Sequence, residues 1–516
     1  MKSTPLSLIA GVVALAAVTG FAALNAPGGG DTTQAGAAAR LPVERSSLLC
    51  PAPSTSDLAE TEYTSFTPKG ENGGEAGAAE LKAAEALPVD EDATGEDADE
   101  EEDADKDKGD ADKEKASDGK PVVSLKDLGK PVTADTTKTD APALVGTATG
   151  RFAPGWTAQQ TTTTAAGGAR GLLGVSCTAP DTDFWFPGAS TAASRQDYVH
   201  LTNPDDTAAV ADIELYGADG PLKSDVGEGI TVPARSSVPM LISTLTSEAA
   251  TNVTVHVTTR TGRVGAVVNA AEDEVGSDWL AASADPAVTQ VLPGIPADAT
   301  SVRLVAFAPG EDDADVKVQL MGKNATFSPA GNATLHIKSQ MTAALDLKDV
   351  TRGEPGSLRL SPADGSRTPV VAALRVVRGT GAKQEVAFIP ATEAVGERAS
   401  VADNRAKGSV LSLTAPGATA EVKVTASAGS ESGEGTVKTY TVKGGTTLEV
   451  TPEAPAGLKG GYALTVETES GGPVHAARTL KITEGGVDMF TVQTLPDDGG
   501  SVEVPAAEQD LSVLDD

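Results

Sequence analysis

The segment Tyr198-Val-His-Leu-Thr-Asn-Pro204 decides the fold of this chain, and Ala209-Val-Ala-Asp-Ile-Glu-Leu-Tyr216 follows it after a short turn. Apolar and polar residues alternate in both segments, which is the pattern of a strand with one face in a core and the other in water. Proline ends the first segment and acidic residues continue the turn. The two segments together are typical of a β-hairpin.

This hairpin recurs twice further along the chain. Its first strand returns as Val302-Arg-Leu-Val-Ala-Phe-Ala-Pro309 and Val410-Leu-Ser-Leu-Thr-Ala-Pro416. Its second strand returns as Ala314-Asp-Val-Lys-Val-Gln-Leu320 and Ala420-Glu-Val-Lys-Val-Thr425. The prolines at positions 204, 309 and 416 stand 105 and 107 residues apart. A near-constant period of this kind is the sign of repeated structural units.

Two further strands keep the same order in each unit. A strand of small residues comes first, as Arg263-Val-Gly-Ala266, Pro369-Val-Val-Ala372 and Pro473-Val-His-Ala476. A strand that runs into proline then closes the unit, at residues 288–293, 386–390 and 492–496. We therefore predict three β-sandwich repeats, at residues 196–294, 299–391 and 408–497.

The fold class that follows is all-β, with tandem immunoglobulin-like or related two-sheet sandwiches. Each unit has about 100 residues and room for about seven short strands, and no cysteine and tryptophan spacing of a true immunoglobulin domain is present. A partial first β domain is expected at residues 143–188, because Ala169–Cys177 and Asp183–Pro187 resemble the last two strands of a unit. The pattern leaves the exact topology open.

The N-terminus carries an uncharged apolar stretch from Leu6 to Leu24, which follows Lys2. At a rise of about 1.5 Å per residue it approaches the roughly 30 Å of a bilayer core. No Ala-x-Ala cleavage pattern follows directly, which favours an uncleaved anchor over a cleaved signal. We predict that residues 1–26 are a signal peptide or signal anchor and form a single N-terminal hydrophobic helix. The rest of the chain is then extracellular or at the cell surface, and this segment is its only contact with the membrane.

Residues 27–142 are predicted to be mostly a disordered, acidic, low-complexity linker, with a candidate strand at 44–50. Acids outnumber lysines by sixteen to four between Asp90 and Asp118, and such a stretch buries too little apolar surface to order itself. Asp103, Asp105, Asp107 and Glu114 match part of a calcium-loop template, but its glycine falls one position late. The tail at 498–516 is likewise expected to be disordered and acidic.

Charge limits the partners that the chain can take. The formal net charge is −33, which repels nucleic acid and anionic lipid and suits solubility outside the cell. Aromatic residues make up 3% of the chain, so stacking platforms for bases or sugars are few. We expect no nucleic-acid partner.

Cys50 and Cys177 are the two cysteines of the chain, and each lies in a short apolar stretch. An even pair in an oxidising exterior forms a disulfide more often than it stays free. The alternative is a pair of buried thiols. A bridge would join the candidate strand at 44–50 to the first folded region and make the acidic segment an insertion.

No constellation of residues points to catalysis, a cofactor or a metal. The four histidines, His200, His256, His336 and His475, each lie in a strand pattern, and none has metal-ligand spacing. We expect them on polar strand faces and expect no enzymatic activity. Phe184, Trp185 and Phe186, with Tyr198 nearby, are the densest aromatic feature and form a candidate binding patch. Packing in the core of the first domain explains these aromatic residues equally well.

The chain resembles an uncharacterised family of secreted or membrane-anchored β-rich proteins from actinobacteria of the Streptomyces type. The leader, Leu48–Pro53, Gly171–Cys177, Phe184–Gly188 and Tyr198–Pro204 carry the resemblance. It implies location and fold class, and it implies no activity. The leading functional hypothesis is a non-enzymatic envelope protein that binds or scaffolds an envelope protein or glycan. The alternative is a carbohydrate- or peptidoglycan-binding module, or a remnant hydrolase, that uses the aromatic patch.

Overall fold

The computed structural model describes residues 39–70, 75–84, 119–224, 226–363, 365 and 367–504. The described residues divide into two units, one that includes residues 39–41 and 502–504 and another that lies within residues 42–501. Strands β1 (Ala39–Pro42) and β38 (Ser501–Val504) pair with each other. The predicted leader at 1–26, the acidic centre at 90–118 and residues 505–516 lie outside the described residues. Within the described ranges, no helix is long and apolar enough to cross a membrane.

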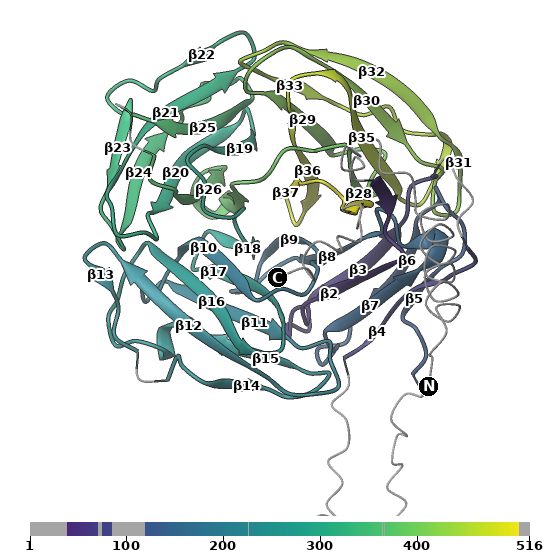
Figure 1. Cartoon of the computed structure of the whole chain (residues 1–516), viewed down its shortest axis with the longest axis horizontal. Coiled ribbons are helices and arrows are strands. Elements are labelled where there is room, and N and C mark those ends of the chain that lie inside the picture. Colours follow the sequence, from purple (N-terminus) through teal and green to yellow (C-terminus); the bar gives the residue numbers. More distant parts are fainter. Residues whose placement is uncertain are drawn as a thin grey trace, which may run out of the picture. The chain divides into compact units, whose positions relative to one another are not determined.

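The larger unit contains four β sandwiches in sequence order, and each consists of two antiparallel sheets (Figure 1). The first sandwich has the sheets β2 (Arg45–Cys50), β7 (Leu144–Thr149), β4 (Ala79–Ala83), β5 (Val123–Leu125) and β6 (Val132–Thr136), β3 (Ala59–Phe66), β8 (Thr157–Thr164), β9 (Gly171–Ser176). The second has β10 (Asp183–Ala189), β16 (Val253–Thr261), β12 (Ala209–Gly217), β13 (Gly220–Pro221), with β14 (Ile230–Val232) also on β12, and β15 (Ser237–Leu241), β11 (Arg195–Thr202), β17 (Gly265–Glu272), β18 (Gly276–Leu280).

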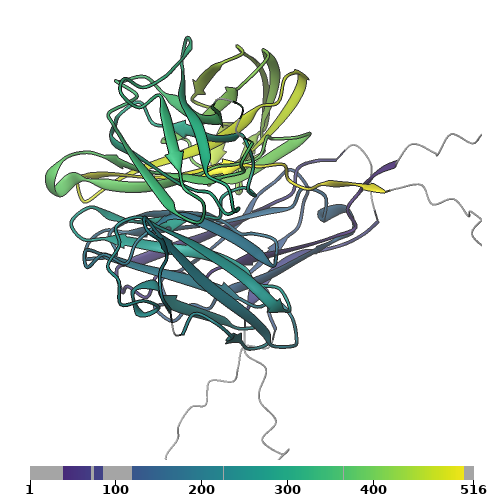
Figure 2. The same ribbon diagram turned by 60° about the vertical axis from the view of Figure 1, so that its left-hand side comes forward.

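The third sandwich has β19 (Gln290–Ile295), β25 (Gly356–Pro362), β21 (Ala314–Gly322), β22 (Thr326–Phe327), with β23 (Thr334–Ile337) also on β21, and β24 (Thr342–Lys348), β20 (Ala299–Phe307), β26 (Val371–Arg378), β27 (Glu385–Pro390). The fourth has β28 (Arg398–Asn404), β35 (Tyr462–Gly471), β30 (Ala420–Ala426), β32 (Thr436–Val442) and β33 (Thr446–Val450), β29 (Ser409–Ala415), β36 (His475–Glu484), β37 (Val487–Leu495). A two-stranded sheet, β31 (Ser432–Glu434) with β34 (Ala456–Lys459), is added to it. Among the described residues, short 3-10 turns occur at η2 (Gly150–Phe152), η3 (Ile242–Thr244) and η4 (Gly381–Lys383). The prediction of an all-β fold is confirmed, and Figure 2 shows the long twisted strands from a second direction.

All four sandwiches share one strand order. In the second sandwich, for example, β10, β12 and β16 share one sheet, whereas β11, β15, β17 and β18 form the other. The chain therefore alternates between the sheets, and its last two main strands are neighbours. In an immunoglobulin domain the first and second strands share a sheet, so this connectivity is a different kind of sandwich. The common order in four copies is the structural counterpart of the sequence period.

The last strand of each sandwich connects the four copies. Strands β9, β18, β27 and β37 are the terminal strands of their sheets. They contact one another in cyclic order, β9 with β18, β18 with β27, β27 with β37, and β37 with β9. The four sandwiches of the larger unit thus pack around a shared interior.

A hydrogen bond between neighbouring sandwiches repeats with the period of the sequence. Thr342 at the start of β24 donates to the carbonyl of Tyr216 at 2.7 Å and to Thr254 Oγ1. Thr447 in β33 donates to the carbonyl of Met321 at the same distance and contacts the Ser357 hydroxyl. The second and third sandwiches and the third and fourth therefore meet in the same way.

The prediction of a disordered linker at 27–142 is wrong for the described residues of this range, which contain β2, β3, β4, β5 and β6. These strands complete the first sandwich, which is not partial. The apolar pattern is weak here because threonine and serine side chains fill buried positions of β3, as when Thr61 bonds to Thr162 at 2.8 Å. The candidate strand at 44–50 corresponds to β2. The described part of the predicted tail also holds a strand, β38.

The predicted repeat boundaries need a shift of one strand. The segment around Phe184–Pro187 is β10, and it pairs with β16 in the second sandwich instead of closing the first. The strand at 288–293 is β19, which pairs with β25 and opens the third sandwich. The strand that closes the second sandwich is β18, which has no terminal proline. Proline-terminated strands open two sandwiches and close others, so the motif alone did not distinguish the two positions.

Candidate functional site

The aromatic residues of the candidate binding patch are divided between two faces of β10. Phe184 and Phe186 point into the core of the second sandwich, with ring centroids 6.4 Å apart. Trp185 points to the other face, where it stacks on Phe307 of the third sandwich at 5.4 Å and is 8% exposed. Tyr198 lies on β11 and does not join them. Alternation along the strand therefore buries all three aromatic side chains in packing contacts.

An acidic and aromatic cluster lies beside Trp185, and we name it the His256 cluster. The imidazole of His256 stacks on Trp185 at 3.6 Å between ring centroids. Its Nε2 lies 3.1 Å from Asp183 and its Nδ1 lies 3.1 Å from Glu214. The Tyr216 hydroxyl donates to Glu214 at 2.9 Å, and burial with this carboxylate raises the pKa of Tyr216.

The cluster was not predicted because it depends on strand register. His256 is the direct partner of Trp185 on one side and of Glu214 on the other. His256 lies 73 positions from Asp183 and 42 from Glu214 in the chain, and the three side chains meet only after β10, β16 and β12 have paired. Its carboxylates are half-exposed, so they are able to bind polar groups from solution. No group of three or more His, Cys, Asp or Glu side chains in the described ranges is arranged to hold a metal ion.

The shared interior contains buried charged residues that join different sandwiches. Asp278 of β18 is fully buried and accepts hydrogen bonds from the backbone of Gly174 at 3.0 Å and from the Thr491 hydroxyl at 3.0 Å. Burial raises the pKa of Asp278 well above its usual value. Its side chain thus links the first, second and fourth sandwiches.

A second interior link starts from Arg170, just before β9. Its Nε lies 2.9 Å from Glu385 of β27, and its Nη2 donates to the carbonyl of Val275 at 2.7 Å and to that of Gln384. Burial raises the pKa of Glu385 to about 7, against the opposing effect of Arg170. This arginine therefore ties the first sandwich to the second and third.

A third link joins the fourth sandwich to the first. Asp403 accepts from Arg405 Nε at 2.8 Å and from the Thr161 hydroxyl at 2.7 Å. Gln159 of β8 accepts from the Asp403 backbone at 2.9 Å and from Arg478 Nη2 at 3.1 Å. Although burial opposes it, the two arginines hold the pKa of Asp403 below its usual value. These residues are threonine, glutamine and charged side chains at strand positions that the sequence pattern assigns to wet faces.

His200 is half-buried where the first and second sandwiches meet. Its ring approaches Trp279 edge-on at 5.2 Å, and among the described residues its buried Nδ1 has no hydrogen-bond partner. Burial lowers the pKa of His200 from 6.5 to about 4, because the charged ring would lose its hydration. His200 alternates with the core residues Val199 and Leu201, so it lies on the outer face of β11 as expected, although neighbouring side chains partly cover that face. The side chain of His336 is exposed, as expected.

We expect the pH dependence of stability to differ between the wild type and His200→Gln. Below pH 6.5 the unfolded wild-type chain gains a proton at His200, and the folded chain does so only near pH 4. The free energy of unfolding therefore falls on acidification by roughly 2 to 3 kcal/mol from this group, a loss that the variant lacks. Urea unfolding near pH 7 and pH 4.5 measures it. If the free energy of unfolding falls equally in the two proteins between pH 7 and pH 4.5, His200 is not held neutral in the folded protein.

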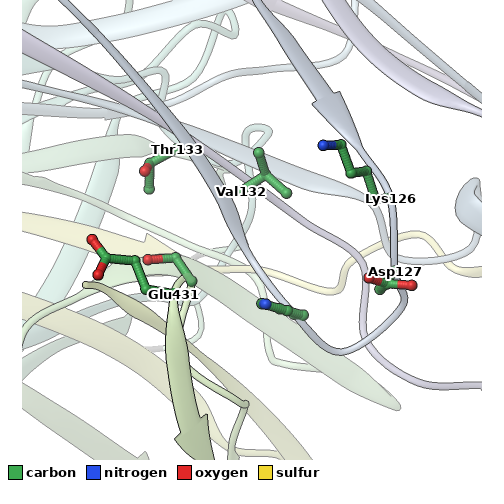
Figure 3. A pocket seen from close by; sticks show the side chains of 7 residues that line it. Lys126, Asp127, Val132, Thr133 and Glu431 are labelled. Atoms are coloured by element: carbon green, nitrogen blue, oxygen red, sulfur yellow. The ribbon is translucent and has the colours of Figure 1, made fainter. Parts of the chain in front are cut away.

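A small cavity of about 250 Å³ lies between the first and fourth sandwiches (Figure 3). Val132 and Thr133 of β6 face it on one side, and Glu431 comes from a separate segment. Two lysines and two acids line it, at Lys126, Lys130, Asp127 and Glu431. Because these charges balance, the cavity selects neither anions nor cations.

The described residues define the class of protein: an all-β chain of four interlocked sandwiches with one disulfide, Cys50–Cys177. A family model matches residues 132–453, which is more than half of the chain, and its description is a family of unknown function, DUF5719. The protein belongs to this family. The comparison with curated proteins and the comparison with solved structures both returned no match.

Proposed function

We propose that the protein is an exported, non-enzymatic protein of the cell envelope whose four sandwiches act as one rigid binding or scaffolding unit. The observation that carries this proposal is the shared interior, in which Asp278, Arg170 and Asp403 each join different sandwiches through buried hydrogen bonds or ion pairs. Breaking a buried link of this kind would leave a polar or charged group buried without its partner, which costs free energy. Motion of one sandwich relative to the others is thus opposed.

Export is supported by two features. The apolar stretch Leu6–Leu24 has the composition of a signal peptide or anchor. The Cys50–Cys177 disulfide is of the kind that persists in oxidising compartments. An envelope protein or a glycan is the partner class that fits this location, and the net charge of −33 disfavours nucleic acid.

Export is tested by fractionating cells that make the native protein and by measuring its intact mass with and without reduction and alkylation. We expect it in the membrane fraction or the medium, with both thiols blocked until reduction. A cytoplasmic protein with two free thiols would overturn the proposed location.

Rigid coupling is tested by comparing two probes of unfolding. The three tryptophans, Trp156, Trp185 and Trp279, all belong to the first two sandwiches, and Trp185 also packs on Phe307 of the third, so their fluorescence reports that half and its contact with the third sandwich. Far-ultraviolet circular dichroism reports strands in all four. We expect coincident denaturant transitions, as for one cooperative unit. Separate transitions would show independent sandwiches and count against a rigid scaffold.

A glycan-binding module or remnant hydrolase is the second candidate, and the His256 cluster favours it. Asp183, Glu214 and Tyr216 present hydroxyl-binding groups next to an aromatic ring. Binding of soluble peptidoglycan fragments that is lost in Asp183→Asn/Glu214→Gln would support this candidate. Absence of glycan binding to the wild type would leave the scaffold as the function.

A further inference from the structure

We propose that a cavity between the third and fourth sandwiches binds a phosphate-bearing small molecule of about the size of a sugar phosphate. The cavity is widely open to solvent, and its volume of about 740 Å³ is of the size of small-molecule sites, about 300–1,000 Å³. Arg378 of β26 lines it from the third sandwich, and the segment 405–408, β36 and β37 line it from the fourth. This site goes beyond the scaffolding function and does not depend on it.

The lining of the cavity is strongly cationic. Arg378, Arg405, Lys407 and Lys481 are among its nine residues, and Asp488 is the single acid. Lysine and arginine together make up 40 of the 516 residues of a chain with net charge −33. The lining residues therefore carry more positive than negative charge, in contrast to the chain as a whole.

Both arginines are fixed in place before any ligand arrives. The guanidinium of Arg378 lies over the ring of Phe490 at 4.8 Å, and its Nε donates to Asp298 at 2.8 Å. The side chain is 10% exposed, and within the described residues its buried Nη1 has no hydrogen-bond partner. Arg405 is held on its Nε and Nη2 side by Asp403 and Glu62. Rigid guanidinium groups suit the geometry of phosphate oxygens.

Lys407 and Lys481 add two positive charges to the lining. Neither lysine forms an ion pair within the described part of the chain, but Asp298 and Glu449 lie close enough to Lys481 to interact with its charge. The carboxylates Asp298, Asp403 and Glu62 lie with the arginines, so the two lysines contribute most of the remaining attraction for an anion. The backbone N–H of Lys481 donates to the Gly408 carbonyl at 2.9 Å. A Cβ on Gly408 would lie 2.1 Å from the Lys481 carbonyl, so the glycine allows the segment 405–408 to approach β36 closely.

The charge of the whole chain decides which anions enter. A polyanion extends beyond the cavity into a field set by a net charge of −33 and is repelled. A compact dianion interacts mainly with charges inside a Debye length of about 8 Å at physiological salt. Ile482 and Thr483 add an apolar and a hydroxyl contact next to the cations, which suit the carbon skeleton of a phosphate monoester. These features favour a small phosphomonoester over a polymer.

Calorimetric titration of the full chain with inorganic phosphate, glucose 1-phosphate and glucose tests the proposal. We expect glucose 1-phosphate to bind more tightly than phosphate, and glucose not to bind. The double variant Lys407→Gln/Lys481→Gln should weaken the binding of glucose 1-phosphate by about tenfold or more. The matched control Lys443→Gln/Lys459→Gln removes two exposed lysines of the same sandwich and should bind as the wild type does.

Three results would overturn this assignment. If the wild type does not bind glucose 1-phosphate, the proposed site does not exist. If both double variants bind glucose 1-phosphate equally weakly, the effect comes from the overall charge of the protein and not from this cavity. Equal affinity for phosphate and glucose 1-phosphate refutes the sugar-phosphate class and reduces the site to one for inorganic phosphate. The single variant Lys407→Gln, on an irregular segment, serves where the double variant does not fold and should still weaken binding by about threefold.

Discussion

Asp403→Ala is expected to lower the free energy of unfolding by about 3–5 kcal/mol, the range for removing one partner of a buried ion pair. The Asp403 side chain is 1% exposed, forms an ion pair with Arg405 and accepts a hydrogen bond from the Thr161 hydroxyl. Alanine would leave Arg405, and the buried Arg478 nearby, without this carboxylate. Denaturant unfolding at neutral pH measures the loss.

The matched control for this change is Asp312→Ala. Asp312 is exposed in the loop before β21, and its replacement should alter stability by less than about 0.5 kcal/mol. Because the pKa of Asp403 is lowered in the folded protein, its contribution is present above the ordinary aspartate pKa of about 3.9 and is lost as the pH falls through the folded value. The difference between wild type and Asp403→Ala should therefore shrink in strong acid. A loss no larger than that of the control would contradict the role of Asp403 as a link between sandwiches.

Removal of the disulfide is expected to destabilise the protein by about 2–5 kcal/mol. Cys50 ends β2 in one sheet of the first sandwich, and Cys177 follows β9 in the other sheet, so the bond joins the two sheets across a separation of 127 residues. In the chain-entropy model, a closed loop of this length restricts the unfolded chain strongly. Thermal and urea unfolding of Cys50→Ser/Cys177→Ser measures the effect.

The reduced wild-type protein is the control for the disulfide variant. It should unfold at nearly the same denaturant concentration as the double serine variant, because both lack the same cross-link. Agreement between these two proteins, together with no loss relative to the oxidised wild type, would contradict the predicted stabilisation. A large loss in the variant alone would point to poor packing of serine at the buried Cys50 position.

Most of what could be predicted about the fold came from the alternation of apolar and polar residues along the strands. The segments 198–204 and 209–216 correspond to parts of β11 and β12, and their copies correspond to β20 and β21 and to β29 and β30. The Cys50–Cys177 bridge is also confirmed. The first sandwich was predicted only in part because β3 and β8 are rich in threonine, glutamate and glutamine with few aliphatic residues, so that hydrogen bonding between Thr61 and Thr162 replaces an apolar signal.

The candidate sites depended on information that no local pattern contains. Trp185 looked like part of an aromatic patch, and the contact with Phe307 of the next sandwich covers it. The His256 cluster required the register of three strands, and the cationic cavity required the docking of the third sandwich against the fourth. Each of these arrangements joins residues that are tens to hundreds of positions apart.

The sequence by itself determined the all-β class, the period of about 105 residues, the hairpins within it and the cysteine pair, because alternation and spacing are local properties of the chain. Only the tertiary structure decided where each sandwich begins, which strands meet in the shared interior, and that Asp278 and Asp403 are buried and His200 is half-buried. The physical reason is that a strand's partner is chosen by the fit of whole sheets and their side chains, and this fit exists only once all four sandwiches have packed together.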